Sequence, residues 1–149
     1  TDKQSLLATL MEDHLTMRQE ALDAALSQAG DSPLDQLEAF TRSRVRFDAT
    51  HPLAARMLEA ELRSLEGDAH ARCASQVAAY ERTLGRVLAA GADAQDFAVP
   101  APALAAAAVL GLLSGAGAYG RGPDAMPVDR VQRISWNMVR RAVGARGYQ

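Results

Sequence analysis

The sequence of 149 residues has a single cysteine, Cys73, and only 5% aromatic residues. One cysteine excludes an intramolecular disulfide and is typical of a reducing compartment such as the cytoplasm. With 48% hydrophobic residues and few aromatic ones, the core is expected to be mainly aliphatic. The length predicts one domain over residues 1–149, with a sizeable core.

An excess of charge of one sign is also lacking, because 16 basic and 18 acidic residues leave a net charge of −2. The total charge therefore gives no reason to expect nucleic-acid binding. Residues 121–149 nevertheless hold six arginines, which we interpret as a solvated helix face, with contact to an anionic partner as the alternative. No signal peptide is expected, since the first residues lack a basic start and an apolar run.

Long hydrophobic runs are rare, and the stretch over residues 101–119 is the one that approaches transmembrane length. It consists mostly of alanine and glycine, and alanine contributes little to membrane insertion compared with leucine or isoleucine. We therefore expect a buried helix that packs in water, and no membrane partner.

The residues that are present follow a helical period throughout, so an all-α fold is predicted. Ser32-Pro33 supplies a cap and a first-turn proline for a second helix. His51-Pro52 ends that helix, because a residue before proline is pushed out of helical geometry. Asp68 is expected to cap the fourth helix, and Gly91 to end it. The six expected helices span approximately residues 2–30, 33–51, 53–65, 68–91, 102–119 and 128–143, with a clear break at 120–127.

The first of these helices is expected to bury one stripe of leucines. Leu6, Leu10, Leu15 and Leu22 recur at helical spacing. At this length the helix is expected to span the whole domain.

Small residues recur on one side of the helix at 102–119. Ala107, Gly111, Gly115 and Ala118 follow one another at steps of four, four and three. Side chains of this size let two helix backbones approach closely. This face is therefore predicted to meet a second copy of the chain.

The helix at 128–143 is apolar on two sides, whereas a helix on the outside of a monomer needs one apolar stripe. Val131, Ile134, Met138 and Ala142 line one side, and Trp136, Val139 and Val143 the other. The second stripe indicates a partner. The predicted dimer interface consists of Ala107, Gly111, Gly115, Ala118, Trp136, Val139 and Val143.

Arg44 lies on an apolar stripe, between Phe40 and Phe47. Buried charges persist only when they are paired. Arg44 either faces a ligand pocket, where its planar guanidinium suits a carboxylate or another anionic group, or it pairs with Glu59 or Glu61 or extends to solvent.

Cys73, Val77 and Tyr80 share one face of the fourth helix, and a buried Tyr80 needs a partner for its hydroxyl. An apolar chamber with a few polar groups is the usual composition of a small-molecule site; a plain apolar core is the alternative. The predicted ligand-binding residues are Phe40, Arg44, Phe47, Met57, Cys73, Val77 and Tyr80.

Catalytic and metal-binding patterns are not found. His70 and Cys73 are three residues apart and could supply two metal ligands, but His51 is explained by the helix break and His14 is distant in sequence. The sequence has no glycine-rich phosphate loop, no Gly-x-Ser-x-Gly and no paired His and Glu at metalloenzyme spacing. No catalytic residue, metal or cofactor is predicted, and an enzyme built on a helical bundle is the less favoured alternative.

Three segments, in this order, resemble the C-terminal regulatory domain of the TetR (tetracycline-repressor) family of bacterial regulators. The first two are Asp2-Lys3-x-x-Leu6-Leu7 and Phe47-x-x-x-His51-Pro52-x-x-Ala55-x-x-Leu58. The third runs from Ala90-Gly91 through Phe97 to Leu104-Ala105-Ala106 and Gly111-Leu112-Leu113. The resemblance implies a six-helix bundle whose last two helices form a dimeric four-helix bundle.

The resemblance also implies a function: a cytoplasmic homodimer that binds a small, mainly apolar effector and thereby releases DNA. The helix-turn-helix that reads DNA in this family is expected to be absent from residues 1–149, so DNA contact would need a segment outside them. A helical interaction or scaffold domain that binds no small molecule is the alternative.

Overall fold

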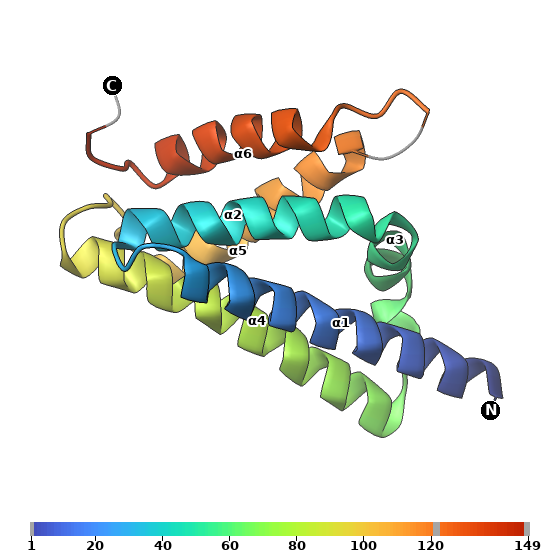
Figure 1. Ribbon diagram of the computed structural model, residues 1–149. Helices are drawn as coiled ribbons and strands as arrows, with labels where there is room; N and C mark the ends of the chain where they lie inside the picture. The colour runs from blue at the N-terminus through green and yellow to red at the C-terminus, as the bar shows by residue number, and fades with distance from the viewer. Residues whose placement is uncertain (1, 121–122, 148–149) are drawn as a thin grey trace.

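The computed structural model describes residues 2–120 and 123–147, which form six α-helices and no strand (Figure 1). The predicted all-α fold with six helices is confirmed. Residues 121–122, in the predicted break, and 148–149, in the arginine-rich end, lie outside the described residues. The helices are α1 (Asp2–Gln28), α2 (Pro33–Thr50), α3 (Pro52–Glu61), α4 (Gly67–Asp93), α5 (Pro102–Gly117) and α6 (Val128–Ala142), with short 3-10 turns at Leu62–Ser64 and Ala118–Gly120.

Local rules explain most helix ends. The Ser32 hydroxyl accepts a hydrogen bond from the Asp35 amide at 3.1 Å, and Pro33 occupies the first turn of α2. Helix α4 begins at Gly67, so Asp68 lies in its first turn and not at the predicted cap.

The end of α4 also differs from the prediction, because Gly91 lies inside the helix. A Cβ at Gly91 would come within 2.0 Å of the Phe97 ring. The glycine is therefore needed for close packing of the following loop on α4, and not as a helix terminator.

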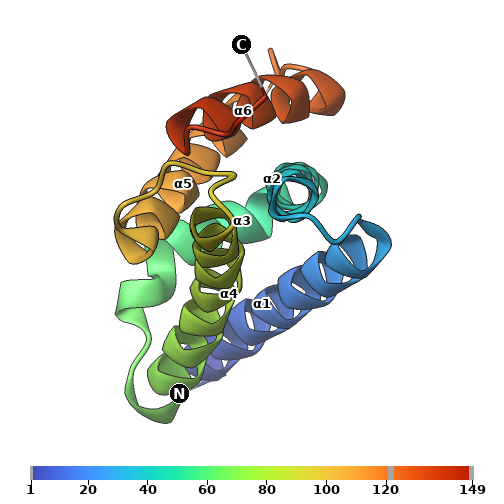
Figure 2. The ribbon, with the colours of Figure 1, turned by 90° about the vertical axis from the view of Figure 1, so that its left-hand side faces the viewer.

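Helix α2 lies at the centre of the bundle. It contacts α1, α3, α4, α5 and α6, and Figure 2 shows it nearly end-on, with α6 on one side and α1 and α4 on the other. Because every other helix packs on α2, charged residues on its inner face lie far from bulk water.

Buried apolar residues form two clusters. The larger lies between α2, α4, α5 and α6 and includes Phe40, Leu84 and Val139, with Leu22 as its buried member from α1. The smaller joins α1, α3 and the start of α4 and includes Met11 and Cys73. Helix α1 therefore passes from one cluster to the other along its length.

The buried stripe of α1 differs from the prediction in its first turns. Leu6 and Leu10 are 61% and 45% exposed, whereas Ala8 and Met11 are buried. Leu15 and Leu22 are buried as expected. The early leucines belong to a second, overlapping stripe, and periodicity alone does not distinguish the two.

The prediction that Trp136, Val139 and Val143 of α6 and its end lie in a dimer interface is wrong. Trp136, Val139 and Val143 are buried in the core of their own chain, so they are not available to a second copy. Ile134 and Met138, from the other stripe, are 37% and 43% exposed. The physical reason is that α2 and α5 pack against the side of α6 that carries the larger Trp136 side chain.

Helix α5 is also less buried than predicted. Pro102–Gly120 has the length and hydropathy of a membrane span, yet 22% of that window is buried within the chain. One face of α5 packs on α2, α4 and α6, and its other face is apolar and uncovered. Within the single chain α5 is therefore buried on one face, and burial of its other face stays a prediction that depends on a second copy.

Candidate functional site

Five buried side chains with polar groups lie together where α1, α2 and α4 meet. Each is less than a tenth exposed, although three of them carry a formal charge at neutral pH. We call them the buried polar cluster. Its members are His14 and Arg18 from α1, Arg44 and Asp48 from α2, and Tyr80 from α4.

Arg44 is paired within its own helix. Its Nε donates to Asp48 Oδ2 at 2.8 Å, and its Nη2 donates to Ser114 Oγ of α5 at 3.0 Å. Burial lowers the pKa of Arg44, but interactions with Tyr80 and Asp48 outweigh it, so the pKa lies above its usual value. The internal acid is therefore Asp48, one turn along α2, and neither Glu59 nor Glu61.

Arg18 also lies against the Tyr80 ring, but it forms no ion pair with an acidic side chain among the described residues. Its Cζ is 4.0 Å from the centre of the Tyr80 ring, whereas Arg44 Cζ is 5.7 Å away. Arg18 Nε is buried without a hydrogen-bond partner among the described residues. Burial, and then repulsion from Arg44, lower the pKa of Arg18 to about 10, so it stays charged at neutral pH.

A cavity of about 300 Å³ opens beside these two arginines. We call it the α1–α5 chamber, because every helix from α1 to α5 contributes to its wall. Its size lies at the lower end of small-molecule sites. The lining residues are Arg18, Arg44, Leu58, Glu59, Leu62, Arg63, Val77, Tyr80, Glu81, Leu110 and Ser114.

The structure brings three of the predicted ligand-binding residues to this chamber: Arg44, Val77 and Tyr80. Phe40 lies beside Tyr80, with ring centres 5.0 Å apart, but it is not part of the wall. These four positions are compatible with the predicted pocket, with Phe40 as support.

The other predicted residues lie elsewhere. Cys73 is fully buried in the smaller apolar cluster, and Met57 packs against that cluster. Phe47 contacts the rings of His14 and His51, with centres 5.1 and 4.2 Å apart. None of the three lines the chamber.

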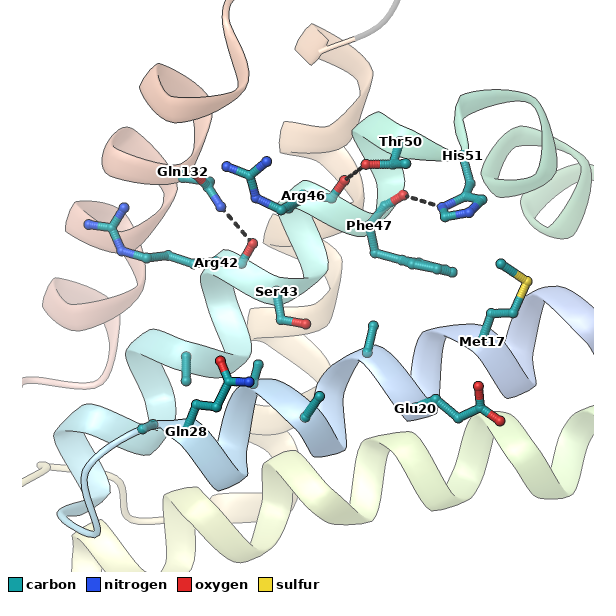
Figure 3. Close-up of a pocket in the computed structure, with 15 residues that line it drawn as sticks. Met17, Glu20, Gln28, Arg42, Ser43, Arg46, Phe47, Thr50, His51 and Gln132 are labelled. Atoms are coloured by element: carbon teal, nitrogen blue, oxygen red, sulfur yellow. Dashed lines mark hydrogen bonds between the residues drawn. The ribbon is translucent and has the colours of Figure 1, made fainter.

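A larger open groove of about 840 Å³ lies between α1, α2 and α6 (Figure 3). Phe47 points into it from α2, opposite Met17 of α1. Its charged residues belong to the surface: Arg46 is exposed, and the half-buried Arg42 side chain pairs with Glu38 at 2.7 Å. The buried Gln132 is neutral and donates to the Arg42 carbonyl at 2.9 Å. The larger cavity is therefore not the one that contains buried charge, and we place the candidate site in the smaller chamber.

Sequence reasoning missed several groups that matter here. Arg18 follows Leu15 by three residues and precedes Leu22 by four, which is the same signal of a charge on an apolar stripe that identified Arg44. Asp48 also lies four residues from Arg44 and could have been identified. Ser114 gave no signal, because its contact with Arg44 joins residues 70 positions apart.

His14 makes the stability of the domain depend on pH. Burial, and then the charge of Arg18, lower its pKa from 6.5 to about 4; Asp48 opposes this shift, and His51 and Arg44 add to it. Between these values the unfolded chain binds a proton that the folded chain excludes, so stability falls as the pH drops below about 6.5. Over about two pH units the loss is about 2 kcal/mol.

This dependence can be measured by urea unfolding from neutral pH to about pH 4.5. His14→Phe should flatten the slope, because phenylalanine does not titrate and can pack against Phe47. His70→Gln is the matched control, since His70 is exposed. Equal slopes for the two variants would show that His14 is not the group responsible.

Known proteins share this architecture. A family model described as "Tetracyclin repressor-like, C-terminal domain" matches residues 30–118, more than half of the chain. No curated protein matches the chain.

Several solved structures share the fold. A tetR-family regulatory protein from Rhodococcus RHA1 is 23% identical with a TM-score of 0.83, over 96% of this chain and 75% of that one. The TetR-family regulator PfmR from Thermus thermophilus is 20% identical with a TM-score of 0.81, over 98% and 78%. AibR, solved with isovaleryl coenzyme A and operator DNA, is 15% identical with a TM-score of 0.76, over 96% and 76%.

Proposed function

The chain belongs to the family of tetracyclin repressor-like C-terminal domains, and on that premise we propose that it senses a small molecule and pairs with a second copy of itself in a transcriptional regulator. The observation that carries the proposal is the α1–α5 chamber, which combines apolar walls with buried charged groups. Such a chamber is the usual setting for a small effector. Regulators of this family are generally not enzymes, and we assign no catalytic residue.

Two structures with the same fold support a small metabolic effector. AibR was solved with isovaleryl coenzyme A and operator DNA, and a protein from Clostridium perfringens is described as a putative fatty acid metabolism regulator. The volume of the chamber, about 300 Å³, limits the effector here to a molecule smaller than an acyl coenzyme A.

Helix α1 is the element that would transmit binding. It supplies Arg18 to the chamber and leaves the bundle at its N-terminal end (Figure 1). An effector that binds one tilt of α1 more tightly shifts the population toward that tilt. Because DNA half-sites are about one helical turn apart, a small change of tilt in a dimer would spoil operator binding by a preceding DNA reader.

The exposed apolar face of α5 and α6 is the proposed dimer interface. Leu104 and Tyr119 are each 71% exposed, and Met138 is 43% exposed. Ala107, Gly111, Gly115 and Ala118 also face outward, which is consistent with the predicted small-residue contact. An exposed apolar face of this extent marks an interaction site, and a second α5–α6 pair would form a four-helix bundle with it.

Native mass spectrometry of the chain purified from its host tests both parts of the proposal. We expect a dimer that carries the extra mass of a co-purified small molecule. Val77→Phe should fill part of the chamber and remove that mass while the dimer persists, because Val77 lines the chamber on α4. Ala74→Phe is the matched control, since Ala74 is exposed on the same helix.

The alternatives give different spectra. An empty dimer whose melting temperature is unchanged by a metabolite library would favour a scaffold domain without a ligand. A monomer would remove the proposed interface. Bound mass that persists in Val77→Phe would place the effector outside the chamber.

A further inference from the structure

The charges around the α1–α5 chamber do not balance. Arg18 and Arg44 are both cationic and buried, and Asp48 is the one buried carboxylate among the described residues. That carboxylate is already hydrogen-bonded to Arg44. Tyr80 does not compensate for Arg18, because burial raises the pKa of its hydroxyl, although both arginines act against this, and it stays neutral.

Other acidic side chains near Arg18 lie at the edge of the chamber. Glu59 and Glu81 line it but are exposed, as is Arg63. Arg18 forms no ion pair within 4.0 Å among the described residues, and its polar contact is with the face of the Tyr80 ring. Arg18 is 6% exposed, so it is largely removed from bulk water.

Burying a cation without a carboxylate partner lowers the stability of the fold. We therefore expect such a cation at a site where it binds an anion. Arg18 lines a cavity, so the missing anion has a place to bind. A guanidinium is well suited to carboxylate because its planar fork donates two parallel hydrogen bonds.

We propose that the effector is a small organic acid whose carboxylate pairs with Arg18, while its apolar part packs against Leu58, Leu62, Val77 and Leu110. This inference rests on the proposed effector chamber and names the chemical class that the chamber takes. Arg44, held by Asp48 and Ser114, forms the fixed wall beside the carboxylate. The volume corresponds to about ten water molecules, which suits a short aliphatic or single-ring acid.

Matched pairs of acids and amides test the charge. Hexanoate with hexanamide, and benzoate with benzamide, have nearly the same shape and differ in charge. In thermal-shift and calorimetric titrations at neutral pH, the acids should stabilise the full chain and the amides should bind at least about tenfold more weakly. Arg18→Met should remove the preference for acids. Arg56→Met, at an exposed position of α3 outside the chamber wall, should keep it.

The ligand-free variants give a second readout that does not depend on the choice of acid. If the role of Arg18 is to bind an anion, Arg18→Met should leave the melting temperature of the ligand-free domain unchanged or raise it by about 2–4 °C. A lower melting temperature in Arg18→Met would mean that the arginine is structural and would overturn the proposal.

Failure of this inference differs from failure of the proposed function. Amides that bind as tightly as acids, with binding lost in Val77→Phe, would refute the acid while retaining the effector chamber. A neutral co-purified molecule would likewise refute the acid and retain the effector chamber. An empty chamber together with a destabilised Arg18→Met would refute both.

Discussion

Replacing Arg44 with methionine is expected to cost the domain about 3 kcal/mol of unfolding free energy, the lower end of the range for breaking a buried ion pair. The substitution leaves the Asp48 carboxylate, which is 4% exposed, without its partner at 2.8 Å. Arg18 remains near Asp48 and offsets part of its charge, which is why the lower end applies. Urea unfolding at neutral pH measures the loss, which is a large fraction of the stability of a typical domain.

Helix α2 provides its own control for this prediction. Arg42 and Glu38 form a second pair at the same spacing of four residues and at 2.7 Å, but their side chains are 38% and 34% exposed. Arg42→Met should therefore cost less than about 1 kcal/mol. The double variant Arg44→Met/Asp48→Leu should regain most of the lost stability, because an apolar pair can replace a buried ion pair. If Arg44→Met and Arg42→Met lowered the free energy of unfolding equally, the buried ion pair would contribute no more to stability than the exposed one.

Replacing Gly111 and Gly115 with leucine is expected to split the proposed dimer and weaken self-association by at least about 100-fold. Two leucines would force apart helices that approach through small residues. Within one chain, a Cβ at either glycine meets no atom within 4 Å. Leucine also has the higher helix propensity, so the monomer should fold at least as well as before.

Sedimentation of the double variant over a range of concentrations measures the change. Ala74→Leu adds the same side chain at an exposed site on α4 and should leave the dimer intact. A Gly111→Leu/Gly115→Leu chain that still sediments as a tight dimer would show that this face of α5 is not the contact.

The candidate site was predictable in part. Arg44 was predictable because a charged residue on an apolar stripe needs a partner when it is buried. Val77 and Tyr80 were predictable because they share one face of a helix. Arg18 carries the same signal, but the predicted stripe of α1 includes Leu6 and Leu10, which are exposed. Arg18 lies on the buried face with Met11, Leu15 and Leu22, which that stripe only partly matches.

The contacts that complete the site were harder to predict. Ser114 reaches Arg44 across 70 residues, and the rings of His14 and His51 approach to 6.2 Å from different helices. No spacing in the sequence encodes such distances, since they depend on how α1, α2 and α5 pack on one another.

The sequence by itself determined the number of helices and the approximate position of most of their ends, with both ends of α4 as exceptions. Prolines, the Ser32 cap and a 3.6-residue period act over a few residues, so they can be read from the sequence. It also determined that α5 has a face of small residues. The tertiary structure alone decided which stripe of α6 turns inward, burying Trp136 and exposing Met138, and which charge of the buried polar cluster is left without a carboxylate. The physical reason is that periodicity defines the faces of a helix, whereas burial and charge pairing depend on the neighbours that cover them.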